Sequence, residues 1–204
     1  MTSGPLHKRH IMKKLILCGI LAIGTMLAAK AQEVSFGVKG GLNISKLTAL
    51  DDSKALAGFN AGGLVHIGLN DSWAIQPELL YSAQGAKLNG TIFFGLAHIP
   101  STIKLNYVNV PVMVQYTIAD AFFVEAGPQL GILASAKIKT DNHTRDIKDE
   151  TKSIDFGLGF GCGYRFDMGL GINARYNFGL TNAFDSDNFN HKNSVAQIGL
   201  FYQF

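Results

Sequence analysis

Residues 154–166 read IDFGLGFGCGYRF, and this stretch decides the fold. Every second residue, starting with Ile154, is apolar, whereas the residues between them are glycine, Asp155 or Arg165. Successive side chains of a β-strand point to opposite faces, so the pattern predicts one strand with an apolar face and a face of small or polar groups. Because the glycines recur at every second position of a strand, they indicate barrel packing and not a phosphate-binding loop.

The same alternation runs through most of the chain after residue 32. In residues 170–180 the apolar side chains alternate with Gly, Asn and Arg, and in residues 196–204 mainly with Gly and Gln. No window after residue 32 has a comparable helical period, which predicts an all-β protein. The predicted strands are eight: 33–44, 58–69, 72–84, 103–117, 121–137, 153–166, 169–180 and 193–204.

The connections between these strands alternate in length. Asn70-Asp71, Ala119-Asp120 and Asp167-Met168 carry the Asp or Asn typical of tight turns. The longer links lie near 45–57, 85–102, 138–152 and 181–192. About 9–11 tilted residues cross a bilayer, and an even strand number with short turns on one side is typical of bacterial outer-membrane barrels. We therefore predict an eight-stranded antiparallel transmembrane up-and-down β-barrel, with short periplasmic turns and four longer extracellular loops.

The N-terminus has the features of a secretory leader. A basic stretch begins at Met12, which is the expected start, and an apolar run to Ala29 precedes the A-x-A pattern at residues 29–31. We expect residues 1–31 to be a cleaved signal peptide and 32–204 to be the barrel domain. The leader holds five of the 18 basic residues and none of the 15 acidic ones, so the remainder carries a net charge of −2. No basic stripe is left that would favour nucleic-acid binding.

Composition excludes two further classes. The chain is 47% apolar and only 16% charged, which excludes intrinsic disorder. Its 2 cysteines are too few for a disulfide scaffold. A soluble lipocalin-like barrel is the alternative fold, but its outer face would need charged groups, whereas the non-apolar face here is mostly Gly, Asn, Gln and Ser. The apolar face is therefore expected to meet lipid.

Aromatic residues on the apolar face gather near the tight turns and the C-terminus. At these strand ends a membrane barrel carries an interfacial aromatic girdle. The predicted girdle consists of Trp73, Tyr116, Tyr164, Tyr202 and Phe204. Tyr107 alone among the tyrosines falls on the opposite face. Pro77, Pro111 and Pro128 also fall within predicted strands, where the missing N–H predicts bulges or local breaks.

Three motifs resemble a known family. They are FGVKGGLNI at residues 36–44, IQPELLYS at residues 75–82 and NVPVMVQY at residues 109–116. Together, and in this order, they are similar to the PorT-like "porin family" outer-membrane barrels of the Bacteroidetes, and the resemblance covers essentially the whole chain after the leader. It implies an integral outer-membrane protein of a Gram-negative bacterium, and it implies little about activity.

The charged residues on the non-apolar face are predicted to point into the lumen. They are three cations and three anions: Lys39, Glu78, Glu125, Asp155, Arg165 and Arg175. A charge in a narrow, low-dielectric interior is costly unless it is paired, so we expect a balanced network of salt bridges and hydrogen bonds. Side chains just fill the interior of an eight-stranded barrel. A conducting pathway is the alternative interpretation.

The sequence predicts no catalytic, cofactor or metal site. Glu78 and Glu125 are two carboxylates, but no His stands in a nucleophile-type arrangement with Ser or Asp. No two His or Cys residues have ligand spacing, and Asp185-Ser186-Asp187 lacks the Gly and closing Glu of a calcium loop. We therefore expect a non-enzymatic protein.

The predicted role is structural or interaction-based: envelope integrity, adhesion or envelope assembly. A narrow porin-like channel for ions or very small solutes is the alternative function. The expected partners are outer-membrane lipid, the barrel-assembly machinery through the C-terminal strand ending at Phe204, and envelope or surface proteins through the loops, of which residues 137–152 carry mixed charges.

Overall fold

The computed structural model describes residues 33–47, 53–92, 97–119, 121–140, 143–148, 151–182 and 192–204. The expected leader, residues 1–31, lies outside this part of the chain. No helix in the described ranges is long and apolar enough to cross a membrane. The described residues form these strands: β1 Glu33–Leu47, β2 Ser53–Gly68, β3 Trp73–Ile92, β4 Ala97–Ala119, β5 Phe122–Thr140, β6 His143–Asp146, β7 Ile154–Arg165, β8 Leu170–Asn182 and β9 Lys192–Gln203.

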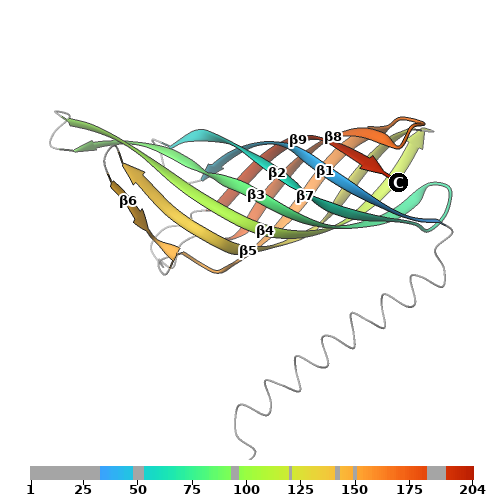
Figure 1. The fold of residues 1–204 in the computed structure, drawn as a ribbon, viewed down its shortest axis with the longest axis horizontal. Helices are drawn as coiled ribbons and strands as arrows, with labels where there is room; N and C mark the ends of the chain where they lie inside the picture. The colour runs from blue at the N-terminus through green and yellow to red at the C-terminus, as the bar shows by residue number, and fades with distance from the viewer. Residues whose placement is uncertain are drawn as a thin grey trace, which may run out of the picture.

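Eight of these strands close into an antiparallel barrel (Figure 1). Each long strand pairs with its neighbours in sequence, β1 pairs with β9, and β5 follows β4 and pairs with β7. Closure leaves no strand edge with unpaired N–H and C=O groups, which is required wherever water is absent. The prediction of an eight-stranded up-and-down barrel is confirmed.

Tight turns and both ends of the described chain lie at one end of the barrel, which we call the turn end. There, Asn70 Oδ1 accepts hydrogen bonds from the backbone N–H groups of Ser72 (3.0 Å) and Trp73 (2.8 Å). Gly169 closes another turn with φ of +79°, a conformation that L side chains rarely adopt. The opposite end, with the longer connections, is the loop end, which is the left-hand end in Figure 1.

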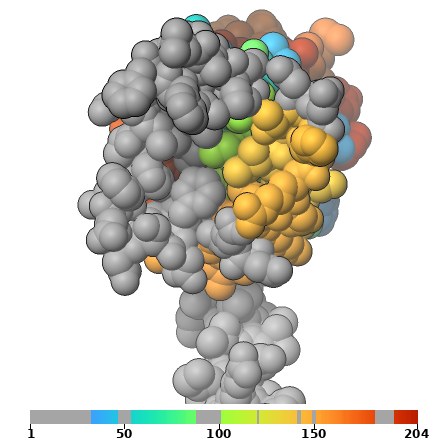
Figure 2. Space-filling model, turned by 90° about the vertical axis from the view of Figure 1, so that its left-hand side faces the viewer, coloured from blue at the N-terminus to red at the C-terminus, as the bar shows by residue number. Residues whose placement is uncertain are grey.

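Several strands at the loop end are longer than the sequence indicated. The prediction that residues 85–102 form a link was wrong for most of that range, because the β3–β4 ladder continues to the pair Ile92 and Ala97. A ninth strand, β6, pairs with the end of β5 inside the predicted link 138–152, and Figure 2 looks onto this end, where β5 and β6 appear in yellow and orange. The side-chain alternation that marks a half-buried strand stops here, while the backbone hydrogen bonds continue.

The outer wall of the barrel is an apolar band. On β4 the outward side chains from Val108 to Ile118 are apolar, and a tilted strand of that length covers a height of about 25 Å, which matches the apolar band of a membrane barrel. Large apolar side chains stay exposed around this wall, among them Phe36, Leu42, Leu79, Phe156, Phe160, Ile172, Ile198 and Leu200. Many polar and charged side chains are buried instead, so the usual soluble arrangement is inverted.

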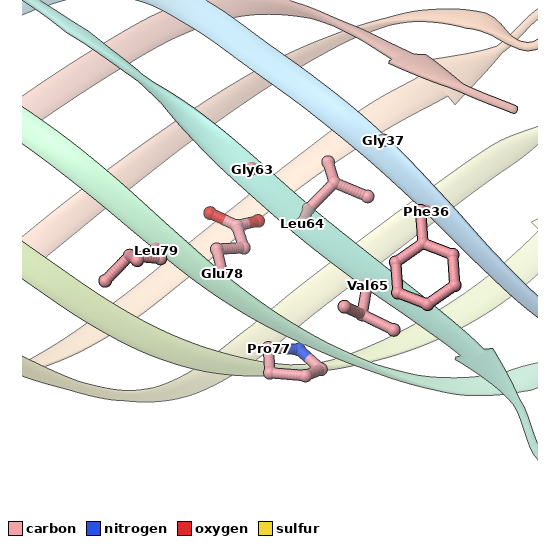
Figure 3. Close-up of a pocket in the computed structure, with 8 residues that line it drawn as sticks. All are labelled: Phe36, Gly37, Gly63, Leu64, Val65, Pro77, Glu78 and Leu79. Carbon is pink, nitrogen blue, oxygen red and sulfur yellow. The ribbon is translucent and has the colours of Figure 1, made fainter.

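Pro77 interrupts the wall without shifting its register. The β2–β3 pairs stop at Leu64 and Glu78 and resume at Ile67 and Ile75, because proline has no N–H to donate to the ladder. A depression of about 400 Å³ lies beside this gap, lined from β1, β2 and β3 (Figure 3). Register shifts occur elsewhere, for example between Asn106 and Tyr107 on β4. The sequence predicted either a bulge or a local break at the prolines, and at Pro77 the structure has a local break.

Candidate functional site

Four charged side chains meet in the middle of the lumen and form what we call the ionic layer: Lys39, Glu78, Glu125 and Arg175. Arg175 Nη1 and Nη2 each donate to one oxygen of Glu78 at 2.8 Å. Its Nε donates to Glu125 Oε1, also at 2.8 Å. One guanidinium on β8 therefore links carboxylates from β3 and β5. Its bidentate pair with Glu78 is of the strongest kind of hydrogen bonding between side chains.

The remaining bonds of the ionic layer saturate its carboxylates. Lys39 Nζ lies 3.3 Å from Glu78 Oε1, and the Gln76 amide donates to the same oxygen at 2.8 Å. The Gln115 amide donates to Glu125 Oε2 at 3.1 Å. The layer holds two cations and two anions and is almost fully buried, with side-chain exposures of 0–3%. A buried cluster of charges is tolerated when every partner is satisfied and the net charge is zero.

Inward-facing glycines on β7 make room for this layer. A Cβ atom at Gly161 would stand 3.0 Å from Glu125 Oε1, and one at Gly159 would stand 2.6 Å from Asn177 Oδ1. The alternating glycines of residues 154–166 therefore have a packing role. They leave this side of the lumen empty of side chains, so that Arg175 and Glu125 from the neighbouring strands β8 and β5 can fill it.

An amide layer lies on the loop side of the ionic layer. Asn43 is its centre, because its Nδ2 donates to Ser82 Oγ at 2.9 Å and its Oδ1 accepts from the Asn60 amide at 2.6 Å. Gln197 Nε2 on β9 donates to the same oxygen at 3.1 Å. Neutral hydrogen bonds inside the lumen thus join four consecutive strands of the wall, β3, β2, β1 and β9.

Two apolar clusters lie at the ends of the lumen. At the turn end, Leu64, Phe123 and Phe201 are buried together, and the two rings meet edge to face at 6.1 Å. At the loop end, a larger cluster includes the buried Ile147 from the segment that follows β6. Its members are Ala86, Ile103, Leu105, Tyr107, Leu133, Ala136 and Ile147. The lumen is therefore filled in layers, with charged and amide groups enclosed between apolar groups.

Asp155 and Arg165 do not join the ionic layer. They stand near opposite ends of β7. Asp155 Oδ1 accepts a hydrogen bond from Thr181 Oγ1 at 2.5 Å. Arg165 donates to Gln115 Oε1 at 3.3 Å, and its guanidinium lies 5.3 Å from the centre of the Phe123 ring. The structure thus brings together four of the six charged residues expected in the lumen and places the other two outside that layer.

The aromatic residues expected to form a girdle lie on the outer wall at the turn end. Trp73 and Tyr116 are register partners on β3 and β4, with ring centres 4.8 Å apart. Tyr202 and Phe204 contact each other at 5.4 Å. All of these side chains, and that of Tyr164, are exposed.

The described residues offer little for catalysis. Glu78 and Glu125 both bind Arg175, so neither carboxylate is free to take a proton from a substrate. His66 lies on the lumen face of β2, where its Nδ1 is buried without a hydrogen-bond partner, and His143 is exposed on β6. No group of three or more His, Cys, Asp or Glu side chains in this part of the chain is placed to hold a metal ion.

Sequence reasoning missed the two apolar clusters. Their signal was present, because Ile103, Leu105 and Tyr107 occupy alternate positions on the face that was otherwise polar. Phe201 likewise shares the face of Gln197 and Gln203. Apolar side chains on a polar face indicate internal closure of the lumen.

The outer membrane protein beta-barrel domain model matches residues 30–185 of the chain. No curated protein sequence matches this chain. Among solved structures, Neisserial surface protein A is similar at 14% identity, covering 85% of this chain and 100% of that chain with a TM-score of 0.60. Ail of Yersinia pestis aligns at 16% identity over 84% and 97% of the two chains, with a TM-score of 0.47. OprG of Pseudomonas aeruginosa aligns at 15% identity over 83% and 95%, with a TM-score of 0.41. At such identities the likeness to the Neisserial protein concerns the fold.

Proposed function

The chain belongs to the outer membrane protein beta-barrel domain family, and from this premise we propose that it is a non-conducting, non-catalytic barrel with a structural or interaction role. Envelope integrity, adhesion and envelope assembly are the roles that such a barrel can serve through its wall and its loops. The finer assignment, a PorT-like barrel of the Bacteroidetes, is supported by three motifs that form the membrane-height parts of β1, β3 and β4.

The layered closure of the lumen carries this proposal. An ion crossing the barrel would have to pass the apolar cluster around Leu105, the amide layer around Asn43 and the ionic layer around Arg175. The ion would lose its hydration shell in the apolar cluster, which costs free energy. In the ionic layer it would meet charges that are already fully paired, so that layer would not replace the lost hydration. A filled interior also matches the size of an eight-stranded barrel.

Planar-bilayer recording on the refolded chain tests the proposal. We expect no steady unitary conductance at moderate voltages in molar salt. A matched variant, Leu105→Gly with Leu133→Gly, removes side chains from the loop-end cluster and should leave the recording silent, because the ionic layer still closes the lumen. Steady conductance steps from the unmodified chain would overturn the closed-lumen proposal.

A narrow channel for ions or very small solutes is the second candidate, and one observation favours it. Several buried amide atoms have no protein partner, including Oδ1 and Nδ2 of Asn177 and Nδ2 of Asn109. Buried polar atoms of this kind are commonly satisfied by water. Conductance that disappears when Asn177 is replaced by leucine would support this candidate over the closed barrel.

We further propose that the exposed aromatic residues at the turn end form a girdle in the periplasmic interface. The family's outer-membrane location and the amphipathic shape of Trp and Tyr support this position. Trp73 is the only tryptophan, so its fluorescence reports one depth.

We expect lipids brominated near the headgroup to quench Trp73 more strongly than lipids brominated near the chain ends. The variant W73F/V112W moves the probe to an outward position in the middle of the band and should reverse that order, because Val112 is exposed on the wall. Stronger quenching of Trp73 by the deep bromine would contradict the girdle.

The proposed partners follow from the same placement. Phe204 continues the outward face of β9, and its backbone N–H donates to Phe36 O at 2.8 Å, which ties the chain end to β1. We propose that the barrel-assembly machinery recognises β9 and the exposed aromatic side chain of Phe204. Envelope or surface proteins are proposed to meet the loop end, because recognition commonly uses loops on a rigid scaffold.

A further inference from the structure

Five lysines form a continuous strip on the outer wall at the loop end: Lys54, Lys87, Lys104, Lys137 and Lys139. We propose that this lysine strip binds the phosphate-bearing headgroup of an outer-leaflet lipid, whose apolar part enters a notch in the wall directly below it. The inference depends on the outer-membrane location and is independent of whether the lumen conducts.

The register places like charges opposite each other across the strip. Lys54 on β2 is paired with Lys87 on β3, and Lys104 on β4 is paired with Lys137 on β5. Side chains at such positions have Cβ atoms about 4.5–5.5 Å apart, and like charges there destabilise a sheet. An anion between them turns this repulsion into attraction.

The strip holds few negative charges of its own. Lys139 is paired with Thr102 on one side and Thr144 on the other. In the described part of the chain, Asp146 is the one carboxylate in register with a lysine of the strip, and it stands opposite Lys137 on β6. All five lysines are exposed. The strip is therefore a positively charged surface available to an external anion.

The strip lies at the upper border of the apolar band. On β4 the outward residues change from Val108 to Asn106 and then to Lys104. The Asn106 amide donates to Ser135 Oγ on β5 at 2.9 Å, which marks the same border on the next strand. Headgroups of the outer leaflet lie at this height, and lysine stems reach along the wall while the ammonium group stays at the interface.

A notch of about 410 Å³ opens below the strip, and Lys104 and Asn106 line its upper side. Its floor includes the small residues Ala57, Gly58 and Ala83. Gly58 packs so closely on β3 that a Cβ atom there would overlap the Ala83 carbonyl oxygen. Its lower side is the pair Phe59 and Tyr81, whose ring centres are 5.8 Å apart. A volume of this size lies within the range of small-molecule sites, roughly 300–1,000 Å³.

The combination selects a lipid over a free anion. The notch joins cationic and amide groups on the headgroup side to aromatic and small apolar groups on the acyl side. A soluble phosphate would use only the first half and would be exchanged for other anions in salt. An amphiphile with one or more phosphates matches both halves.

The test uses the refolded chain in nanodiscs of phosphatidylcholine that contain a small fraction of bisphosphorylated lipid A. Lipid retained after release into mild detergent is counted by native mass spectrometry. We expect the unmodified chain to retain bisphosphorylated lipid A in preference to its monophosphorylated form and to phosphatidylcholine. The variant K87Q/K104Q/K137Q should lower that retention at least tenfold, since each lysine at an anionic surface adds to binding.

The control variant K148Q/K152Q removes two charges from exposed lysines between β6 and β7, outside the strip, and should retain lipid A normally, whereas K104Q/K137Q removes two charges from the strip and should not. Ala57→Phe fills the notch without changing charge and should lower retention several-fold. Folding of every variant is checked by heat-modifiable gel migration. Unchanged retention in both the strip and notch variants, equal loss in the control, or displacement of lipid A by millimolar inorganic phosphate would each overturn the proposal.

Discussion

Replacing Arg175 with methionine should lower the free energy of unfolding of the barrel by about 3–5 kcal/mol, the usual cost of removing one partner from a buried ionic cluster. The guanidinium makes three hydrogen bonds of 2.8 Å to Glu78 and Glu125. Without it, two buried carboxylates share the single cation Lys39. Urea unfolding of the refolded chain in lipid vesicles, followed by Trp73 fluorescence, measures the change.

Two matched variants separate this effect from a general loss of packing. R175M/E125Q restores a neutral lumen, with Lys39 and Glu78 still paired, so it should be more stable than R175M alone. Arg165→Met removes a cation whose one hydrogen bond in the described structure is 3.3 Å long, and should cost less than R175M. An R175M protein as stable as the unmodified chain would show that the ionic layer does not hold the barrel together.

The fold could be predicted because the side chains of each barrel strand alternate between the outer wall and the lumen, and this alternation gives the sequence a period of two. Within residues 154–166 the alternation identifies both the strand and its two faces, and no long-range information is needed. The alternation ends where a strand leaves the membrane, so the extensions of β3 and β4 beyond Gly85 and Lys104 could not be recognised. Backbone pairing continues there with side chains that no longer face lipid on one side.

The lumen could be predicted only in part, for a related reason. Alternation shows which residues point inward but gives no height along the barrel axis, because height depends on the stagger between strands. Arg165 and Arg175 are therefore equivalent in sequence, although one reaches the ionic layer and the other lies at the turn end. The lysine strip was hidden in the same way, since only the register places Lys54 opposite Lys87 and Lys104 opposite Lys137.

A second large effect is expected at the two glycines that face aromatic rings in the turn-end cluster. Gly171 is the register partner of Phe201 and Gly163 is that of Phe123. A Cβ atom at either glycine would overlap the opposite ring. Gly171→Ala should therefore destabilise the barrel by about 1–3 kcal/mol, as insertion of extra groups into packed interiors does, and Gly171→Leu should cost more.

The control for this prediction is another glycine-to-alanine change in the same sheet. A Cβ atom at the outward-facing Gly40 would have an ordinary contact of 3.8 Å, so Gly40→Ala should change stability by less than about 0.5 kcal/mol. The swap G171F/F201G places one ring in the same space from the opposite strand and should recover part of the loss from Gly171→Leu. Equal urea midpoints for Gly171→Ala and Gly40→Ala would contradict the expectation, because strand propensity would then outweigh the ring contact. A loss confined to Gly171, with recovery in the swap, would mean that β8 carries glycine at this position because β9 carries phenylalanine.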